Sequence, residues 1–379
     1  MKILQVVKTN TGARWALNQA MHLKELGVEV VTVLPNDKEA NAQKYIENGM
    51  EVIAGNWSLP VKKPWRFFAI RKQIKKTVKE IKPDLIHMHF VTNVMMCRLA
   101  LRKDKTPRVF QVPGPLHLES KLTSFAERCT ATKVDHWAGS CKKTCSIYLN
   151  KGIDANRIHL TYYGIVPKKV SDNVAKRSLR AEYGIPNDTL IVGMICYFYK
   201  PKKIMRHKRG IKGHEDLIDA MKIVLQKHPN AVLVVIGNAH KGAEEYEQKV
   251  KKYAKEVLGD KIIFTGYRND IYDIYPEIDF VVHPSHSENL GGAAESLLLA
   301  VPTISTDVGG FPDIVIPGET GCLAKPKDPI DLAEKITWAI EHPEEMKAMA
   351  VKGQTIVSEL LDLNNTSSAV YDMYKKILN

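Results

Sequence analysis

Residues 280–323 read FVVHPSHSENLGGAAESLLLAVPTISTDVGGFPDIVIPGETGCL, and no other stretch of this sequence is more informative. An apolar run at its start ends at His283-Pro284, and a polar loop leads into Gly291-Gly292, where a helical pattern begins. That pattern stops at Pro302, a second apolar run follows, and Gly309-Gly310 comes directly after it. This order of strand, loop, helix and strand is typical of a parallel sheet covered by helices.

The same alternation extends outward along the chain. Strand-like apolar runs are predicted at 2–7, 28–34, 85–88, 108–112, 190–196, 231–236, 261–264, 280–283 and 303–305. Helical patterns are predicted at 15–26, 65–81, 141–151, 215–227, 243–257, 293–300 and 329–341, with a last helix at 367–378 that Asn364, Asn365 and Thr366 would cap. Near-continuous Val and Ile runs between helices predict an α/β protein with doubly wound parallel sheets.

With 379 residues the chain exceeds one ordinary core, so two domains are expected. We place the first at 1–168 and the second at 169–363, with the polar, basic stretch 167–185 as the boundary and a terminal helix at about 364–379 packing back on the first domain. Ligands of such sheets bind beyond the carboxyl ends of the strands. Two domains of this kind would therefore face a central cleft.

Composition is that of a globular protein, with 44% hydrophobic and 26% charged residues. The apolar stretch at 1–7 is too short for a signal peptide or a membrane span. Six scattered cysteines suit a reducing compartment, which predicts a cytoplasmic location. Cys141 and Cys145 with His136 are conceivable metal ligands, but no fourth ligand is evident and buried thiols are the favoured interpretation.

Charge is distributed unevenly along the chain. Residues 1–170 hold 29 Lys and Arg against 13 Asp and Glu, whereas the remainder holds 26 against 29. The densest run, at 62–82, has nine basic residues, one acid and interleaved aromatics. Such a helix fits an anionic membrane surface, and a solvated helix packed on its own domain is the alternative. No RNA-binding signature, zinc spacing or aromatic platform supports nucleic acid as the partner.

The glycines of residues 280–323 favour an anion site. Glycines at a helix start let backbone N–H groups approach an anion, and the helix dipole favours negative charge there. Glu295, one turn into this helix, is placed to accept hydrogen bonds from a ribose diol, and Gly309-Gly310 gives a second close approach. A lone Gly-Gly before a helix is ordinary packing more often than a site, so the ordered combination carries the interpretation.

This segment resembles the donor-site signature of the retaining GT-B glycosyltransferases, the "glycosyl transferases group 1" family, which is family 4-like. The family pattern is Pro-Ser, a first Glu, a Gly-rich loop, a second Glu, a small residue before x-Pro, and two further Gly pairs. The chain supplies Pro284-Ser285, Glu288, Gly291-Gly292, Glu295, Ala300-Val301-Pro302, Gly309-Gly310 and Gly318 to Gly321. Further matches extend over nearly the whole chain: Pro83 to His87, Tyr163 to Ile165, Lys212-Gly213, Val234 to Gly237 and Phe264 to Gly266.

The resemblance implies donor-site roles. Glu295 would bind the ribose, Glu288 would face the hydroxyls of the donor sugar, and Lys212 would neutralise the diphosphate leaving group. The remaining donor contacts implied are Gly12, which would close the site from the first domain, Gly266 and Arg268 near the base, and the backbone of Asn289, Leu290, Gly291 and Gly292. Because no Asp-x-Asp occurs, fixed cations and helix N-termini are the means left to stabilise the diphosphate, and no metal is predicted.

Two departures from the family pattern affect this site. Six residues separate Glu288 from Glu295, where the family usually has seven. The family's usual Arg upstream of the Lys falls near Tyr197, so Arg209 or Arg206 is expected to supply the second positive charge, and a solvated basic loop is the alternative.

The sequence indicates the acceptor-side residues less clearly than the donor-side residues. Family members often carry a functional His after a strand of the first domain, and the corresponding segment, 112–119, makes His117 the catalytic candidate with Glu119 beside it on the acceptor side. His87 is the alternative acceptor-side residue, and its His-x-His spacing with His89 is compatible with a metal. A His at a strand end is more often structural than catalytic.

Taken together, the resemblance implies a metal-independent hexosyltransferase that retains the configuration of its sugar and needs no cofactor. UDP-sugars are favoured over GDP-sugars as donors. The acceptor would be a glycan or a lipid-linked sugar of cell-surface polysaccharide or glycolipid synthesis, reached by an enzyme that is cytoplasmic and peripheral at the inner face of the membrane. The alternatives are a GT-B sugar-nucleotide epimerase, a phosphorylase, and a non-catalytic relative that only binds nucleotide sugars.

Overall fold

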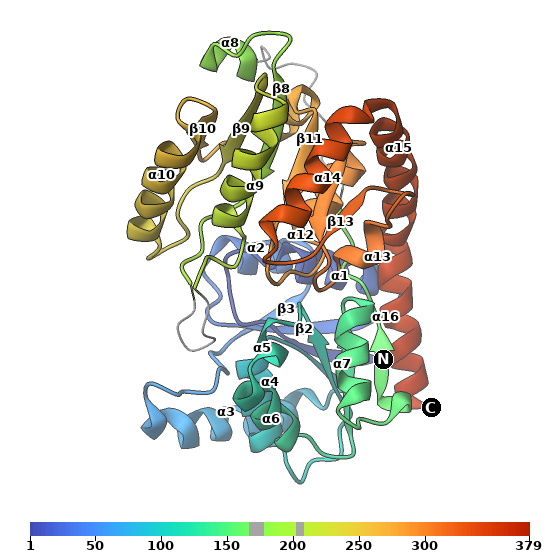
Figure 1. Ribbon diagram of the computed structural model, residues 1–379. Helices are drawn as coiled ribbons and strands as arrows, with labels where there is room; N and C mark the ends of the chain where they lie inside the picture. Colours follow the sequence, from blue (N-terminus) through green and yellow to red (C-terminus); the bar gives the residue numbers. More distant parts are fainter. Residues whose placement is uncertain (167–177, 202–207) are drawn as a thin grey trace. The chain divides into compact units, whose positions relative to one another are not determined.

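The computed structural model describes residues 1–166, 178–201 and 208–379. Its contacts divide the chain into two compact units, Met1–Val166 with Leu360–Asn379, and Pro167–Glu359. The predicted boundary between 168 and 169 lies outside the described residues. Each unit is an α/β body with its own core, drawn in Figure 1 in blue to green with the red C-terminal helix for unit 1 and in green to red for unit 2.

Unit 1 is built on a parallel sheet. Within residues 1–166 seven strands are ordered β3-β2-β1-β4-β5-β6-β7, and every pairing between neighbours is parallel. The strands are β1 (Lys2–Val6), β2 (Glu29–Leu34), β3 (Glu51–Ala54), β4 (Leu85–His89), β5 (Arg108–Val112), β6 (Asp135–Gly139) and β7 (Ile158–Leu160). The order runs outward in both directions from β1 and β4, as in a doubly wound sheet.

Helices cover both faces of this sheet. One face packs under α3 (Phe67–Ile81), α4 (Val91–Ala100) and α7 (Lys142–Asn150), with the short α5 (Leu116–Glu119) and α6 (Lys121–Cys129) beside α4. The 3-10 turns η1 (Pro64–Arg66) and η2 (Ala155–Arg157) complete this side. The other face packs under α1 (Arg14–Glu25), α2 (Ala40–Glu47) and α16 (Leu363–Leu378).

The last helix belongs to unit 1 although it follows unit 2 in sequence. Val370, Met373 and Tyr374 are buried with residues of α1 and of the sheet, and α16 packs along α1. The helix begins at Leu363, earlier than predicted, because the Asp362 side chain accepts a hydrogen bond from the Asn365 N–H (2.9 Å) and caps it. The predicted Asn364–Thr366 cap is therefore wrong: those residues form the first turn.

Unit 2 repeats the architecture. Within 178–201 and 208–359 six parallel strands are ordered β10-β9-β8-β11-β12-β13. They are β8 (Leu190–Ile195), β9 (Ala231–Ile236), β10 (Ile262–Gly266), β11 (Phe280–His283), β12 (Thr303–Thr306) and β13 (Cys322–Ala324). The helices are α8 (Leu179–Tyr183), α9 (His214–Lys227), α10 (Glu244–Leu258), α11 (Ile271–Ile274), η4 (Tyr275–Glu277), α12 (Gly291–Leu298), α13 (Phe311–Ile314), α14 (Pro329–Glu341) and α15 (Pro343–Leu360), of which α15 extends one residue beyond the unit.

The prediction of two doubly wound α/β domains is confirmed, and every predicted strand and helix overlaps an observed one. The sequence patterns missed the strands β3, β6, β7 and β13 and the helices α2, α4, α5, α6, α8, α11, α13 and α15. Of the described helices, none combines the length with the hydrophobicity that crossing a bilayer requires.

Candidate donor site in unit 2

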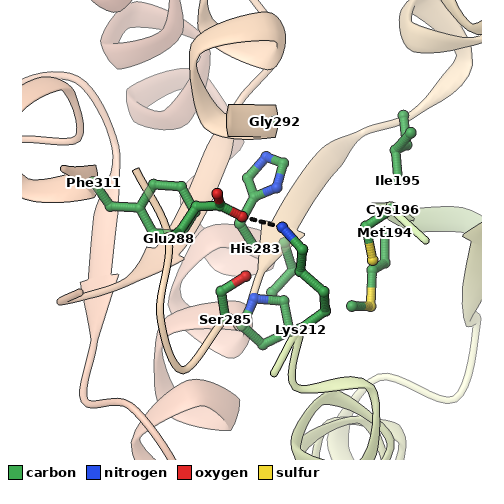
Figure 2. A pocket seen from close by; sticks show the side chains of 11 residues that line it. Met194, Ile195, Cys196, Lys212, His283, Ser285, Glu288, Gly292 and Phe311 are labelled. Atoms are coloured by element: carbon green, nitrogen blue, oxygen red, sulfur yellow. Dashed lines mark hydrogen bonds and ion pairs between the residues drawn. The ribbon is translucent and has the colours of Figure 1, made fainter. Parts of the chain in front are cut away.

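A small pocket lies at the carboxyl ends of β8, β11 and β12, the edge of the sheet where ligands of such folds bind. It is lined by Met194, Ile195, Cys196, Lys212, Val282, His283, Pro284, Ser285, Glu288, Gly292 and Phe311. In Figure 2 the side chains of Lys212 and Glu288 reach toward one another across it, with the His283 ring beside them. Two residues chosen from the sequence as catalytic therefore meet here.

Lys212 is held in place by the backbone that follows it. Gly213 has a left-handed φ of 72°, and a Cβ there would lie 1.9 Å from the Pro284 carbonyl oxygen. The His286 N–H also donates to the Ile211 carbonyl (2.8 Å). These two contacts fix the start of α9 against the loop that follows β11, so that the Lys212 side chain enters the pocket.

The charge on Lys212 is stabilised within the pocket. Burial lowers the pKa of its ammonium, but the carboxylate of Glu288, with which it forms an ion pair, more than offsets this and leaves the pKa above its ordinary value. The two side chains are only 21% and 17% exposed. Lys212 is thus a fixed cation at neutral pH, suited to an anionic ligand.

Glu288 is positioned by glycines from two segments. A Cβ on Gly309, whose φ is 55°, would lie 1.6 Å from the Glu288 carbonyl oxygen, and the Gly310 N–H donates to the Asn289 carbonyl (3.1 Å). On the other side, a Cβ on Gly291 would lie 3.0 Å from Glu288 Cδ. The loop that is one residue shorter than usual in the family therefore still presents Glu288 to Lys212.

The N-terminus of α12 opens beside this ion pair. Leu290 occupies the N-cap position, where no side chain accepts a hydrogen bond, and Gly291 and Gly292 form the first turn. A Cβ on Gly292 would lie 2.8 Å from His283 Cε1, so glycine is needed for packing here as well as for access. Backbone N–H groups of the first turn, with the helix dipole behind them, give a site for negative charge.

The His283 ring packs against the first turn of α12 at Gly292, a role that was not predicted. Its Nε2 lies 3.1 Å from Ser296 Oγ, to which the Thr303 hydroxyl donates (2.8 Å). Burial, reinforced by the charge of Lys212, lowers its pKa to about 3, so the imidazole is neutral. The only sequence signal was its place at the end of a strand.

Glu295 lies one turn farther along α12 and is partly buried. Burial raises the pKa of the Tyr272 and Tyr275 phenols, and the charge of Glu295 raises both further. Glu295 does not line the Lys212 pocket, but it occupies the same helix, on the side of the segment between β10 and β11.

The predicted arginines are engaged elsewhere. Arg209 forms ion pairs with Asp216 (2.5 Å) and Asp219 (2.7 Å) of α9 and lines a second pocket with Glu215, Tyr246 and Tyr253. Arg206 lies outside the described residues. At the position expected for the family's Arg, the aromatic run 197–199 places the Tyr199 ring 5.9 Å from Lys212 Nζ.

Arg268, predicted near the base, is also paired with carboxylates of its own unit. Arg268 is only 9% exposed and pairs with Glu182 (2.7 Å) and Asp270 (2.6 Å). Gly266 ends β10 with a φ of 73°, and its carbonyl accepts from the Gly237 N–H (2.8 Å). The guanidinium of Arg268 thus links α8 to this loop, and a Cβ on Gly266 would meet nothing within 4 Å. That the two residues lie near the base stays a prediction.

In unit 1 the structure contradicts one acceptor-side candidate. His87 is completely buried on β4, where its Nδ1 is hydrogen-bonded to the Tyr374 hydroxyl of α16 and burial lowers its pKa to about 3. His89 is also buried, with Nδ1 3.2 Å from the Tyr163 hydroxyl. Neither ring can contact an acceptor, because both lie between the sheet and the helices that cover it.

The other first-domain candidates remain near the surface. His117 lies on α5 with its Nε2 3.2 Å from the Tyr148 hydroxyl, and burial lowers its pKa to about 4, which keeps it neutral. Glu119 is exposed on the same turn. Gly12 has a φ of 73° before α1, and its carbonyl accepts from Asn41 Nδ2 (2.5 Å). These three residues belong to unit 1, whereas the residues that line the Lys212 pocket belong to unit 2.

The cysteines do not form a metal centre in the part of the chain that the structure describes, where no group of three or more potential ligands occurs. Cys141 Sγ lies 3.1 Å from Thr144 Oγ1 and Cys145 Sγ donates to the His159 carbonyl (3.5 Å). Cys141 is buried, as the favoured interpretation expected, whereas Cys145 is only partly buried.

Comparison with known proteins settles the family. The family model "Glycosyl transferases group 1" matches residues 205–355, and "Glycosyltransferase Family 4" matches residues 12–169. The chain belongs to the glycosyltransferases of group 1. Two models matched in sequence order, one on each half, agree with the two units of the structure.

Two of the similar proteins are named for the synthesis of surface polysaccharides. The chain is 26% identical to the lipopolysaccharide core biosynthesis mannosyltransferase LpsB of Rhizobium meliloti, over 46% of this chain and 50% of that one. It is also 26% identical to the capsular polysaccharide biosynthesis glycosyltransferase CapM of Staphylococcus aureus, over 51% and 47%. The matched regions thus span about half the length of these relatives.

Among solved structures, HepE of Anabaena in complex with UDP superposes with a TM-score of 0.77 at 20% identity, covering 98% of this chain and 99% of that one. The same protein was also solved with UDP-glucose. This similarity confirms the GT-B fold for the chain.

Proposed function

We propose that this protein is a retaining, metal-independent hexosyltransferase that takes its sugar from a nucleotide-sugar donor. The observation that carries the proposal is the Lys212–Glu288 ion pair beside the uncapped N-terminus of α12. A fixed cation and converging backbone N–H groups are what a nucleoside diphosphate leaving group needs as its negative charge develops. Their presence supports leaving-group stabilisation without a metal.

In this proposal the diphosphate replaces Glu288 as the ion-pair partner of Lys212. Lys212 then pairs with phosphate oxygens, and Glu288, released at the mouth of α12, accepts hydrogen bonds from the hydroxyls of the donor sugar. The bond between C1 and the phosphate oxygen breaks, and the acceptor oxygen bonds to C1 from the same face. The acceptor proton passes to the departing diphosphate, so no dedicated protein base is required.

UDP-sugars are the proposed donors, with Glu295 on the ribose. HepE, which shares the fold, was solved with UDP and with UDP-glucose, and this supports uridine over guanosine. The names of LpsB and CapM support an acceptor that is a growing glycan or lipid-linked sugar of a surface polysaccharide. His117 and Glu119 stay proposed acceptor-side residues, and a location at the inner face of a membrane belongs to the same proposal.

The test combines binding with product analysis. Calorimetry in the presence of EDTA should show UDP binding at least tenfold tighter than GDP or ADP. Lys212→Ala should weaken UDP binding by roughly 100-fold, since a charge-assisted contact is worth about 1.5–3 kcal/mol. Lys222→Ala, on the exposed side of α9, is the matched control and should bind as the wild type does.

Hydrolysis of UDP-sugar without acceptor, or NMR of the product formed with one, separates the alternatives. Release of UDP with the anomeric configuration retained supports the transferase. Conversion of the sugar to its epimer would identify an epimerase, and nucleotide binding with no turnover would identify a non-catalytic relative. An EDTA-sensitive reaction would contradict the metal-independent mechanism.

A further inference from the structure

Two exposed apolar groups lie on one side of unit 1, away from its core. The first is at the start of α3. Ile70, Ile74 and Val78 turn into the core, whereas Trp65 and Phe68 are each 72% exposed. The helix therefore uses one apolar face for folding and leaves a second apolar group in solvent.

Cations continue the exposed face of α3. Lys72, Lys75 and Lys79 follow Phe68 by four, seven and eleven residues, which places all four within one narrow arc of the helix, and all are exposed. Of the nine basic residues in 62–82, only Lys76 forms an ion pair within the described part of the chain, at 3.8 Å from Glu80. The positive charge of this face is thus not neutralised by the protein itself.

The second apolar group lies on α6. Leu122 and Phe125 are 72% and 60% exposed and three residues apart, hence on one helical face, with the exposed Lys121 beside them. α6 packs on α4, which packs on α3, so the two groups come from helices on the same face of the sheet; in Figure 1 these helices lie together in unit 1. Sequence analysis had singled out 62–82 but not α6.

We propose that one surface, the docking face, binds an anionic lipid bilayer. It consists of Trp65, Phe68, Lys72, Lys75, Lys79, Leu122 and Phe125. Exposed aromatic and aliphatic side chains bordered by lysines match the boundary between acyl chains and headgroups, where Trp is favoured and where Lys meets lipid phosphate. Nucleic acid would satisfy the lysines but would leave Leu122 and Phe125 without a function. The apolar side chains on both helices therefore select the bilayer.

The experiment measures partition of the purified full-length chain onto vesicles of phosphatidylcholine with 30% phosphatidylglycerol, with pure phosphatidylcholine as reference. Changing Lys72, Lys75 and Lys79 to Ser together should lower partition onto the anionic vesicles by roughly 100-fold or more. Trp65→Ser with Phe68→Ser, and separately Leu122→Ser with Phe125→Ser, should each lower it by roughly tenfold or more.

Matched controls lie in unit 2. Lys222, Lys227 and Lys252 changed to Ser remove the same charge from exposed positions, and Ile330→Ser with Val351→Ser removes two exposed apolar side chains (64% and 59% exposed). Both control proteins should partition as the wild type does. A loss in the controls equal to that in the docking-face variants would overturn the assignment of the surface.

Trp65 provides a direct readout of insertion. Acyl chains brominated near the headgroup should quench the fluorescence of the bound wild-type protein. Trp65→Phe should abolish most of the quenching, because Trp57 and Trp137 are buried and Trp15 and Trp338 are partly buried, whereas Trp65 is exposed. If the lysine variant loses binding while both apolar variants bind normally, and the Leu122 and Phe125 variant, which keeps Trp65, is quenched as the wild type is, the face is a general polyanion patch, and the bilayer proposal is wrong.

These measurements need no donor or acceptor. UDP affinity of the docking-face variants, measured in parallel without lipid, should be unchanged. A failed vesicle experiment therefore leaves the proposed transferase intact, and a protein that binds no nucleotide can still confirm the docking face.

Discussion

At the scale of single residues, the proposed donor would have to open the ion pair between Lys212 and Glu288. Both side chains are largely buried and each neutralises the other. A diphosphate that replaces Glu288 keeps Lys212 paired, so the lysine is never left as an isolated buried charge. In this proposal Glu288 exchanges the ammonium of Lys212 for the hydroxyls of the donor sugar. Binding of the diphosphate is thereby coupled to binding of the sugar.

Asp216 is a positioning residue in this arrangement. It accepts from Arg209 and also forms an ion pair with His286, whose own N–H bonds to the backbone before Lys212. Asp216 therefore ties α9 to the loop that carries Glu288. Both Asp216 and His286 have side chains only 5% exposed, so the link is shielded from solvent.

We expect Asp216→Asn to raise the Kd for UDP by roughly tenfold, because loosening one charge-assisted link costs about 1.5 kcal/mol. Asp219→Asn is the control, since Asp219 pairs with Arg209 but makes no contact with His286 in the described structure. Calorimetry on both variants checks the prediction. Equal losses of affinity in the two would show that Arg209, not the tie to His286, matters.

The sequence predicted which residues lie in the pocket better than it predicted which side chains they contact. Lys212 and Glu288 were assigned by the resemblance to the family and the Gly291-Gly292 pair by its place at a helix start, and the structure brings them together. Arg209 was chosen for its charge, but its charge is used by two acids of α9. Which carboxylate meets an arginine depends on distances across the folded chain, and a linear pattern does not contain them.

At the scale of elements, the loop between β11 and α12 is the part most closely constrained. Gly213 packs against this loop at Pro284, and Gly309 packs against it at Glu288. Gly291 is the residue at which the loop ends and α12 begins. Glycines that the sequence suggested as approaches to a ligand are thus also required for backbone packing. Their combined effect is to fix Glu288 before any donor arrives.

Gly309→Ala should destabilise the protein by roughly 2–4 kcal/mol, through its left-handed φ and a collision with the Glu288 carbonyl, and should lower UDP affinity. Gly318→Ala separates the two causes. Gly318 has a φ of 74° but nothing within 4 Å of a Cβ, so only about 1 kcal/mol is expected. Thermal unfolding and calorimetry of both variants provide the test. Similar affinities in the two would mean that the Gly309 contact does not position Glu288.

One strand that the sequence patterns missed, β6, has an identifiable physical cause. β6 begins with Asp135 and His136, which read as polar, yet Asp135 is completely buried between Arg98 and Arg108. Burial raises the pKa of this carboxyl, but hydrogen bonds from Arg108 and the charge of Arg98 outweigh it and bring the pKa to about 2. A buried ion network can place polar residues inside a sheet, and hydrophobic periodicity does not detect it.

At the scale of the whole molecule, the division into two units with different charge is legible from sequence. The basic half corresponds to unit 1, and α16 returns to that unit through buried contacts such as that of Tyr374 with His87. The alternation of strands and helices predicted both sheets. The alternation did not predict that His87 contacts α16, because a histidine at the end of a strand is equally compatible with a functional site.

The account rests on one claim: unit 2 holds the nucleoside diphosphate at the start of α12. Crystals soaked with UDP test it most directly. We expect density for the diphosphate within hydrogen-bonding distance of Lys212 Nζ and of the backbone N–H groups of Gly291 and Gly292, with the ribose at Glu295. UDP bound at another place, with the Lys212–Glu288 pair unchanged, would contradict the account.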